Sequence, residues 1–297
     1  MSIGGKRAAA LGLSVRSRAA VAGVADLPRN VWRELGRLGV RCLELTLPED
    51  PGDEDFFAFA GELLGRGFEL SFHTPYPNAL DLQDFVDGRD RVGDYYRAWL
   101  RSLRRLPLSL PGPVLVVHGV NAAGVTPGVQ SRARATSVAF LRWLAGESIR
   151  LETPLRLAFE VRPRRAGWTK VGTTCAEVLA VVDEVTAGNV GICWDVGHTI
   201  MNLARQDDIW PPPKAFIART IHTHLHEATA ERDHLPVTPP APRLRQALGL
   251  LATAGYAEAL VLECAFSCWE EVMLGVTTIR RLWEEVRGSR APSPKRL

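Results

Sequence analysis

Long hydrophobic runs are missing from this 297-residue chain. No apolar stretch reaches the roughly 18 residues that a membrane-spanning helix needs. The residues after Met1 include Arg16 and Arg18, where a secretory leader would have an apolar segment and a cleavage site. The sequence therefore argues against a membrane span and a secretory leader, and we expect a cytoplasmic protein.

Cysteine, lysine and net charge are also low. The five cysteines are scattered and odd in number, which argues against a disulfide-stapled scaffold and predicts reduced, mostly buried thiols. Only four lysines are present and the formal net charge is +3, so the composition does not indicate a nucleic-acid-binding protein. With 46% hydrophobic and 23% charged residues, the chain has the composition of a folded globular protein.

Several common catalytic motifs are absent. No GxGxxG or GxxxxGKS/T sequence follows a strand-like run, which argues against a dinucleotide-binding fold and a P-loop. His226 and Glu227 do not open an HExxH zinc motif, because Ala230 stands where the second histidine belongs. Ser14 and Ser71 lack the GxSxG setting of a nucleophilic serine. Zinc proteases and serine hydrolases are therefore unsupported.

Short apolar runs alternate with longer segments of helical period along the chain. The strand-like runs are Ala9 to Val15, Val40 to Leu47, Phe68 to His73, Val114 to His118, Leu155 to Val161, Val190 to Asp195, Thr220 to Leu225 and Ala259 to Cys264. The helical segments are Pro28 to Leu38, Phe56 to Leu64, Tyr95 to Leu106, Val138 to Leu144, Ala176 to Val185, Leu244 to Ala254 and Trp269 to Val286. Pro28 suits a first helical turn, and Thr174 can cap the segment after it.

Eight strand-like runs with helical segments between them predict an α/β fold, the (β/α)8 TIM barrel. A doubly wound sheet would usually carry fewer strands and a glycine-rich first turn. We expect a single domain over residues 1–287, followed by a disordered basic tail over residues 288–297.

All seven histidines and several acids lie at or just beyond the carboxyl ends of these strands, where a TIM barrel builds its active site. Buried Asp, Glu and His side chains are costly unless they are paired or bind a metal, so several at one rim predict a common partner. Four of them occupy equivalent positions on successive strands and are named the metal quartet: Glu160, Asp195, His224 and Glu263. Imidazole with carboxylates suits Zn2+, Mn2+, Fe2+ or Co2+, so we predict that the quartet holds a divalent cation.

Other polar residues of the rim are ambiguous when each is taken by itself. Glu44 or His73 alone is more typical of a hydrogen-bonded structural residue than of a ligand. His222, His224 and His226 alternate with a period of two and so share one face of their strand. Because one strand crosses the rim only once, we expect one of the three to bind metal, with the others supporting it or facing substrate.

In series, these segments resemble the xylose isomerase-like TIM barrels, a superfamily that contains sugar isomerases and epimerases together with endonuclease IV. The matching segments keep the family's order over about residues 8 to 285: His73-Thr-Pro-Tyr76, Val116-Val117-His118-Gly119, Leu157-Ala-Phe-Glu160, Gly191-Ile-Cys-Trp-Asp195-Val-Gly-His198, His222-Thr-His224-Leu-His226, Asp233-His234-Leu-Pro236, Gly255-Tyr256 and Leu262-Glu263. The most specific are the DxxH after an apolar strand, the DHLP and the final LVLE.

The resemblance to the epimerase branch implies a reaction. It implies that the quartet holds the metal and that Glu160 and Glu263 also move a proton, one removing it and the other returning it on the opposite face. The metal would polarise a carbonyl and a hydroxyl of the sugar and stabilise an enediolate.

The predicted function is therefore a divalent-metal-dependent isomerase or epimerase of a small sugar, a sugar phosphate or a related polyhydroxy carbonyl compound. His198 and Arg232 would contact substrate oxygens. The full group assigned to substrate binding is His198, Arg232, His234, Tyr76 and His222. A barrel that only binds a metabolite is a further hypothesis, and the intact Glu160 and Glu263 weigh against it.

The endonuclease IV branch implies an alternative, in which metal-bound hydroxide hydrolyses a phosphodiester of abasic DNA. His73 and His118 match further metal ligands there, and His198 and His234 match two ligands of a third zinc. That zinc also needs an aspartate where this chain has Arg232, and a guanidinium does not ligate metal. We therefore expect one or two metals, with His73 and His118 as candidate ligands.

The arginine-rich residues 162–165 have two interpretations. Together with Tyr76, they would contact DNA phosphates under the endonuclease alternative. Under the isomerase reading, the same arginines would hold a sugar phosphate or solvate a loop. Nucleic acid is thus a partner only in the alternative.

Overall fold

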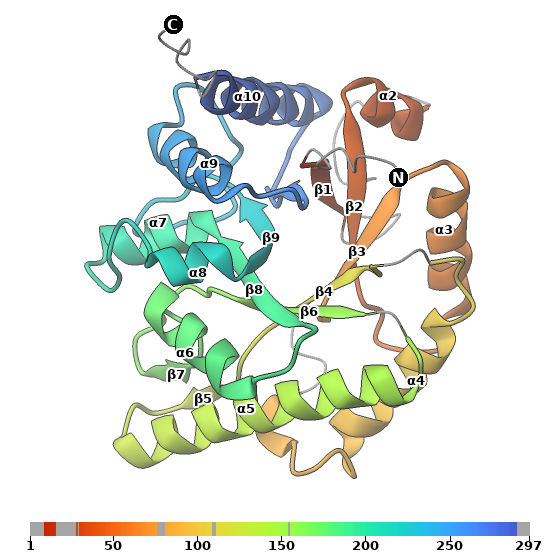
Figure 1. Ribbon diagram of the computed structural model, residues 1–297, viewed down its shortest axis with the longest axis vertical. Coiled ribbons are helices and arrows are strands. Elements are labelled where there is room, and N and C mark those ends of the chain that lie inside the picture. The colour runs from red at the N-terminus through yellow and green to blue at the C-terminus, as the bar shows by residue number, and fades with distance from the viewer. Residues whose placement is uncertain are drawn as a thin grey trace, which may run out of the picture.

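The structure is a computed structural model that describes residues 9–15, 28, 30–75, 81–108, 111–153 and 155–289. Eight parallel strands close into one barrel, with helices around it (Figure 1). The barrel strands are β1 (Leu11–Val15), β2 (Val40–Thr46), β3 (Glu69–His73), β4 (Val114–Val117), β6 (Arg156–Glu160), β8 (Val190–Asp195), β9 (Thr220–Leu225) and β10 (Leu260–Leu262). Strand β1 pairs with both β2 and β10, which closes the ring. The predicted (β/α)8 fold is confirmed, and every barrel strand lies within its predicted run.

The main outer helices match the seven helical segments predicted from the sequence. They are α2 (Val31–Arg37), α3 (Glu54–Gly65), α4 (Arg91–Leu103), α5 (Pro127–Arg150), α6 (Cys175–Val185), α9 (Pro242–Ala254) and α10 (Trp269–Gly288). Helix α5 departs most from its prediction, because it spans 24 residues. Thr126 caps it and Pro127 occupies its first turn, whereas the apolar periodicity begins only at Val138.

The two predicted helix starts differ in outcome. The hydroxyl of Thr174 accepts the backbone N–H of Glu177 at 3.0 Å, so Thr174 caps α6 as predicted. The prediction that Pro28 lies in a first helical turn is wrong, because α2 begins at Val31. Asn30 has the non-helical angles φ −114° and ψ 51°, which delay the helix beyond the proline.

Within the described residues, five shorter elements were not predicted. Helix α7 (Val196–Ala204) follows β8 without a loop, because the carboxylate of Asp195 accepts the backbone N–H of His198 at 2.7 Å and caps the helix. The others are α8 (Lys214–Ala218), the 3-10 turn η1 (Leu82–Asp84), and β5 (Asn121–Ala123), which pairs antiparallel with β7 (Trp168–Lys170). The β5–β7 pair comes after the carboxyl ends of β4 and β6, so it adds residues to the rim of the barrel.

Residues on the barrel strands alternate between two environments. Outward-facing residues such as Leu43, Phe159 and Trp194 pack beneath the helices in the main hydrophobic core. Val116, Ala158 and Cys193 belong to a separate, small apolar cluster. The barrel interior is thus filled partly by small residues, which leaves room for the buried polar side chains at its carboxyl end.

The end of the described chain bears on the predicted tail. Helix α10 continues through Gly288, the first residue assigned to that tail. Residues 290–297 lie outside the described residues. Among the helices of the described part, none is long and apolar enough to cross a membrane.

Candidate metal centre

The carboxyl ends of four strands bring the metal quartet together. Glu160 ends β6, Asp195 ends β8, His224 lies in β9 and Glu263 directly follows β10. The Nδ1 atom of His224 lies 3.0 Å from Glu263 Oε2, 3.5 Å from Glu160 Oε1 and 3.7 Å from Asp195 Oδ2. One donor atom from each residue lies within 4.8 Å of the other three. The quartet therefore converges around His224 Nδ1.

The donor atoms of the quartet fit a divalent cation. His224 Nδ1 and Glu263 Oε2 are buried and have no hydrogen-bond partner within the described residues. A buried polar atom without a partner is costly, so two at one point call for an additional ligand. An imidazole nitrogen with carboxylate oxygens is a set that Zn2+, Mn2+, Fe2+ or Co2+ accepts.

The carboxylates of the quartet stay ionised in spite of their burial. Burial raises the pKa of Glu160, but the neighbouring imidazoles, His118 foremost, hold that pKa well below its usual range. Burial also raises the pKa of Asp195, and His198 is the main group that lowers it well below its usual range. Ionised carboxylates are the form that binds a cation.

A second group of potential ligands shares Glu160 with the quartet. His118 Nε2 lies 2.6 Å from Glu160 Oε2, and His73 Nε2 lies 3.4 Å from the same oxygen. Nδ1 of His73 is 2.8 Å from the carbonyl of Thr74, to which it donates, so a neutral His73 keeps its Nε2 lone pair toward Glu160. Glu160 therefore offers Oε1 to the quartet and Oε2 to this pair, the arrangement of a bridging carboxylate.

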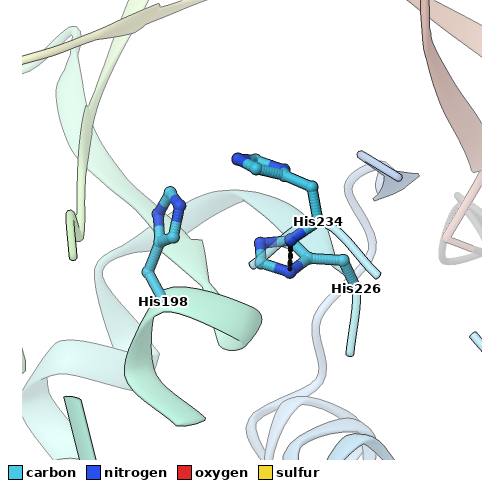
Figure 2. A group of neighbouring side chains, drawn as sticks. All are labelled: His198, His226 and His234. Carbon is cyan, nitrogen blue, oxygen red and sulfur yellow. Dashed lines mark hydrogen bonds between the residues drawn. The ribbon is translucent and has the colours of Figure 1, made fainter. Parts of the chain in front are cut away.

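A third group consists of His198, His226 and His234 (Figure 2). The rings of His226 and His234 stack with centroids 4.4 Å apart, and His198 stands edge-on to both. His226 Nδ1 accepts the backbone N–H of His234 at 2.9 Å, the dashed line in Figure 2. A neutral His226 therefore carries its proton on Nε2, which donates to Asp195 Oδ1 at 3.0 Å. His226 thus orients a carboxylate of the quartet.

Gly197 leaves the space that the His226 ring occupies. A Cβ atom at this position would lie 2.0 Å from Cε1 and 2.1 Å from Nδ1 of His226. We expect Gly197→Ala to displace the ring from Asp195 and to destabilise the fold by about 1–3 kcal/mol, the usual cost of overpacking. Denaturant unfolding measures this loss.

The matched control is Gly249→Ala in α9, where a Cβ would meet nothing within 4 Å. This variant should be neutral or more stable, by up to about 1 kcal/mol, because alanine is the better helix former. Equal stability of the two variants would contradict the role given to Gly197.

The residues assigned to substrate binding are less uniformly placed. His198 Nδ1 lies 2.9 Å from Asp195 Oδ2, and His234 Nδ1 donates to the carbonyl of Glu263 at 2.8 Å, so both lie at the centre. Arg232 is exposed on the loop that follows β9. Tyr76 lies outside the described residues.

His222 lies deeper in the barrel than the substrate-binding assignment implied. It is 1% exposed, and its Nε2 lies 2.8 Å from Glu44 Oε2. His222 and His224 share a face, but the β8–β9 register sets His222 beside Cys193 and His224 beside Asp195. The two histidines therefore differ in their depth along the barrel axis, although they share one face of the strand.

Two acids that were not assigned to the site lie in or beside it. Glu44 on β2 contacts His222 and His224 beneath the quartet. Asp233 Oδ2 lies 3.6 Å from His198 Nε2, and this contact with His198 is the main reason that the pKa of Asp233 falls to about 2. Two features of the sequence could have identified these acids: Glu44 has an inward position on its strand, and Asp233 directly precedes His234.

The sequence and the fold agree with one family. A family model described as xylose isomerase-like TIM barrel matches residues 32–273, and the chain belongs to this family. A search of curated proteins found no match.

Three solved structures illustrate the likeness. A D-tagatose 3-epimerase-like protein has a TM-score of 0.71 and 16% identity, covering 95% of this chain and 100% of its own. An L-ribulose 3-epimerase has a TM-score of 0.65 and 17% identity, with coverages of 97% and 100%. A D-allulose 3-epimerase from Methylomonas sp. has a TM-score of 0.64 and 18% identity, with coverages of 94% and 98%. At these identities the likeness establishes the fold.

Proposed function

We propose that this protein is a divalent-metal-dependent isomerase or epimerase of a small sugar or a related polyhydroxy carbonyl compound. The observation that carries the proposal is the convergence of three carboxylates on the unpartnered Nδ1 of His224 at the carboxyl end of the barrel. Structural neighbours described as tagatose, ribulose and allulose 3-epimerases support the choice of substrate class.

The residues of the quartet have distinct parts in this reaction. When bound there, a divalent cation polarises the substrate carbonyl and stabilises the negative charge that develops on its oxygens. The side chain of Glu263 is 16% exposed, whereas that of Glu160 is 1% exposed, so Glu263 is the more accessible base for a carbon-bound proton. Glu160 ends β6 and Glu263 follows β10, and β8 and β9 lie between these two strands, so the two carboxylates flank a substrate from two directions.

Proton transfer follows from this arrangement. Glu263 takes the proton from one face of the carbon and then releases it to solvent, and Glu160 takes up a solvent proton and returns it to the other face, which inverts the configuration. His198 and His234 line the same centre, where their side chains are placed to hydrogen-bond the hydroxyl groups of the substrate.

The experiment that tests the proposed function uses a panel of free ketoses and ketose phosphates in D2O, with Mn2+, Co2+ or Zn2+ supplied. We expect one substrate class to be converted to an epimer or isomer that carries deuterium at the reacting carbon. The absence of both product and deuterium for every member of the panel would contradict the proposal.

A cationic group beside the centre favours a substrate that carries an anion. Lys170 ends β7 and donates to the carbonyl of Pro163 at 3.0 Å, while Arg162, 7% exposed, donates to the carbonyl of Gly119 next to His118. The charges of Glu160 and Asp233 act on Lys170, which places it beside the centre. Burial, followed by the charges of Arg162 and Arg165, lowers the pKa of Lys170 to about 8.

We therefore expect Lys170→Met to raise the KM for a ketose phosphate by about 10- to 100-fold, the loss of one charged hydrogen bond, and to spare the free ketose. Lys170 is protonated below its pKa, so phosphate affinity should fall as the pH rises through about 8. Lys214→Met, an exposed lysine on α8, is the matched control. Equal effects on the free and the phosphorylated ketose would contradict this assignment.

A metal-dependent phosphodiesterase is the second candidate function. It is favoured by one observation, the His73 and His118 pair that meets the quartet at Glu160 Oε2. A pair of metal ions that share one carboxylate ligand is typical of enzymes that hydrolyse phosphodiesters. Metal analysis with an incision assay on a duplex containing an abasic site separates the two functions.

Under our proposal the duplex stays intact at any metal content, and His118→Ala changes only the number of bound metals. Robust incision that is lost together with the second metal in His118→Ala would establish the second candidate instead.

A further inference from the structure

A carboxylate lies beneath the quartet, inside the barrel. Glu44 on β2 is fully buried, and its side chain contacts two histidines of β9. His224 Nε2 lies 3.0 Å from Glu44 Oε1 and 3.1 Å from Oε2, and His222 Nε2 lies 2.8 Å from Oε2. Glu44 therefore touches the one histidine of the quartet from the side opposite to Glu263.

The two nitrogens of His224 have different partners. Nε2 faces Glu44, whereas Nδ1 faces Glu263, Glu160 and Asp195 and has no hydrogen-bond partner within the described residues. A neutral imidazole carries one proton, and a cation held by the quartet would take the lone pair of the nitrogen that faces the three carboxylates, so the proton belongs on the nitrogen that faces Glu44. With the proton on Nε2, the lone pair of Nδ1 points to the centre of the quartet.

His222 stabilises the carboxylate in this buried place. Glu44 is 0% exposed in a barrel interior that also holds the apolar cluster of Val116, Ala158 and Cys193, so bulk water does not contact its carboxylate. The N–H groups of His222 and His224 replace that solvation, one on each side of the carboxylate. Burial raises the pKa of Glu44, but His224 and then His222 hold it below its usual range.

From this geometry we infer that Glu44 is a positioning residue, which accepts a hydrogen bond from the Nε2–H of His224 so that Nδ1 is the metal ligand, and that His222 acts through Glu44. The inference rests on the proposed metal centre and adds a residue pair that the reaction itself does not touch. Carboxylates that hold a ligating histidine in this way typically change metal affinity 10- to 100-fold when they are removed.

The first test measures the affinity of the metal-free protein for Zn2+ by competition with a chromogenic chelator. We expect Glu44→Gln to weaken Zn2+ binding by about 10- to 100-fold, because an amide both accepts and donates and no longer fixes the proton on Nε2. Glu147→Gln is the matched control, since Glu147 is 8% exposed on α5 and pairs with Arg150 outside the barrel. Its Zn2+ affinity should equal that of the wild type.

A double-mutant cycle tests whether His222 acts through Glu44. His222→Leu removes the N–H that Glu44 accepts, and His222→Gln keeps an N–H near the same place. We expect His222→Leu to weaken Zn2+ binding, His222→Gln to restore most of the affinity, and His222→Leu to have no further effect in the Glu44→Gln background. Additive effects of the two substitutions would overturn the coupling.

A third measurement uses the wild-type protein, so it does not require that any variant folds. Nitrogen-15 NMR of the Zn2+-loaded protein should show His224 protonated at Nε2 and bound to metal through Nδ1. Coordination through Nε2, or wild-type Zn2+ affinity in a folded Glu44→Gln, would overturn the inference. If the wild type binds no divalent metal at all, it is the proposed metal centre that fails, so the two failures are distinguishable.

Discussion

Glu263→Gln is expected to slow exchange of the carbon-bound substrate proton with solvent deuterium by about 10²- to 10⁴-fold, the usual contribution of a general base. Glu263 is the most exposed member of the quartet, and its Oε2 lies 3.0 Å from His224 Nδ1. An amide keeps the size and an oxygen for the cation, but it cannot accept the proton. Substrate binding should therefore be largely spared when exchange is followed by proton NMR at saturating metal.

Glu258→Gln is the control for this experiment. Glu258 lies just before β10 and pairs with Arg156 at 3.1 Å, at the amino end of the strand that Glu263 follows. Exchange should proceed at the wild-type rate in this variant. Exchange that persists at the wild-type rate in Glu263→Gln would mean that another residue is the base.

Removal of the metal is expected to abolish turnover and to lower thermal stability. Without a cation, Glu160, Asp195 and Glu263 place carboxylates within a few ångströms of each other in a buried site. A cation that binds the folded chain alone stabilises it by about 2.7 kcal/mol when its free concentration is 100 times Kd. The Tm measured by calorimetry and the turnover rate should therefore both fall on dialysis against a chelator and recover when the metal is returned.

Asp195→Asn provides the comparison for that experiment. It removes one charged ligand, so the difference in Tm between chelated and metal-loaded protein should shrink or disappear. Full turnover in the chelated wild type, at an unchanged Tm, would contradict a metal requirement.

The barrel was predictable because its strands are short apolar runs bounded by helical segments. The same logic placed the quartet, since the carboxyl ends of parallel strands meet at one rim. Elements without strong periodicity were not predictable. Helix α7 depends on a cap by Asp195, and the β5–β7 pair joins three-residue strands from different loops.

The different partners of the three histidines of β9 could not be predicted from the sequence. Period two gives His222, His224 and His226 the same face, but it does not give their depth. A register irregularity in the β8–β9 pairing, between Ile192 and Cys193, sets that depth. His222 consequently meets Glu44, and His226 meets Asp195.

The loop after β9 gives a second case. The sequence assigned Arg232 to the substrate, whereas Asp233 is the residue whose carboxylate approaches His198. His234 adopts a positive φ of 52°, a conformation that a local sequence pattern does not predict for histidine. That turn, held by the bond from His234 N–H to His226, orients the loop.

The most direct test of the metal centre is a crystal structure of the Mn2+-loaded protein with anomalous diffraction data. We predict a cation peak coordinated by Glu160, Asp195, Glu263 and Nδ1 of His224. A protein that binds no cation at saturating Mn2+, or binds it only away from the quartet, would contradict the central claim.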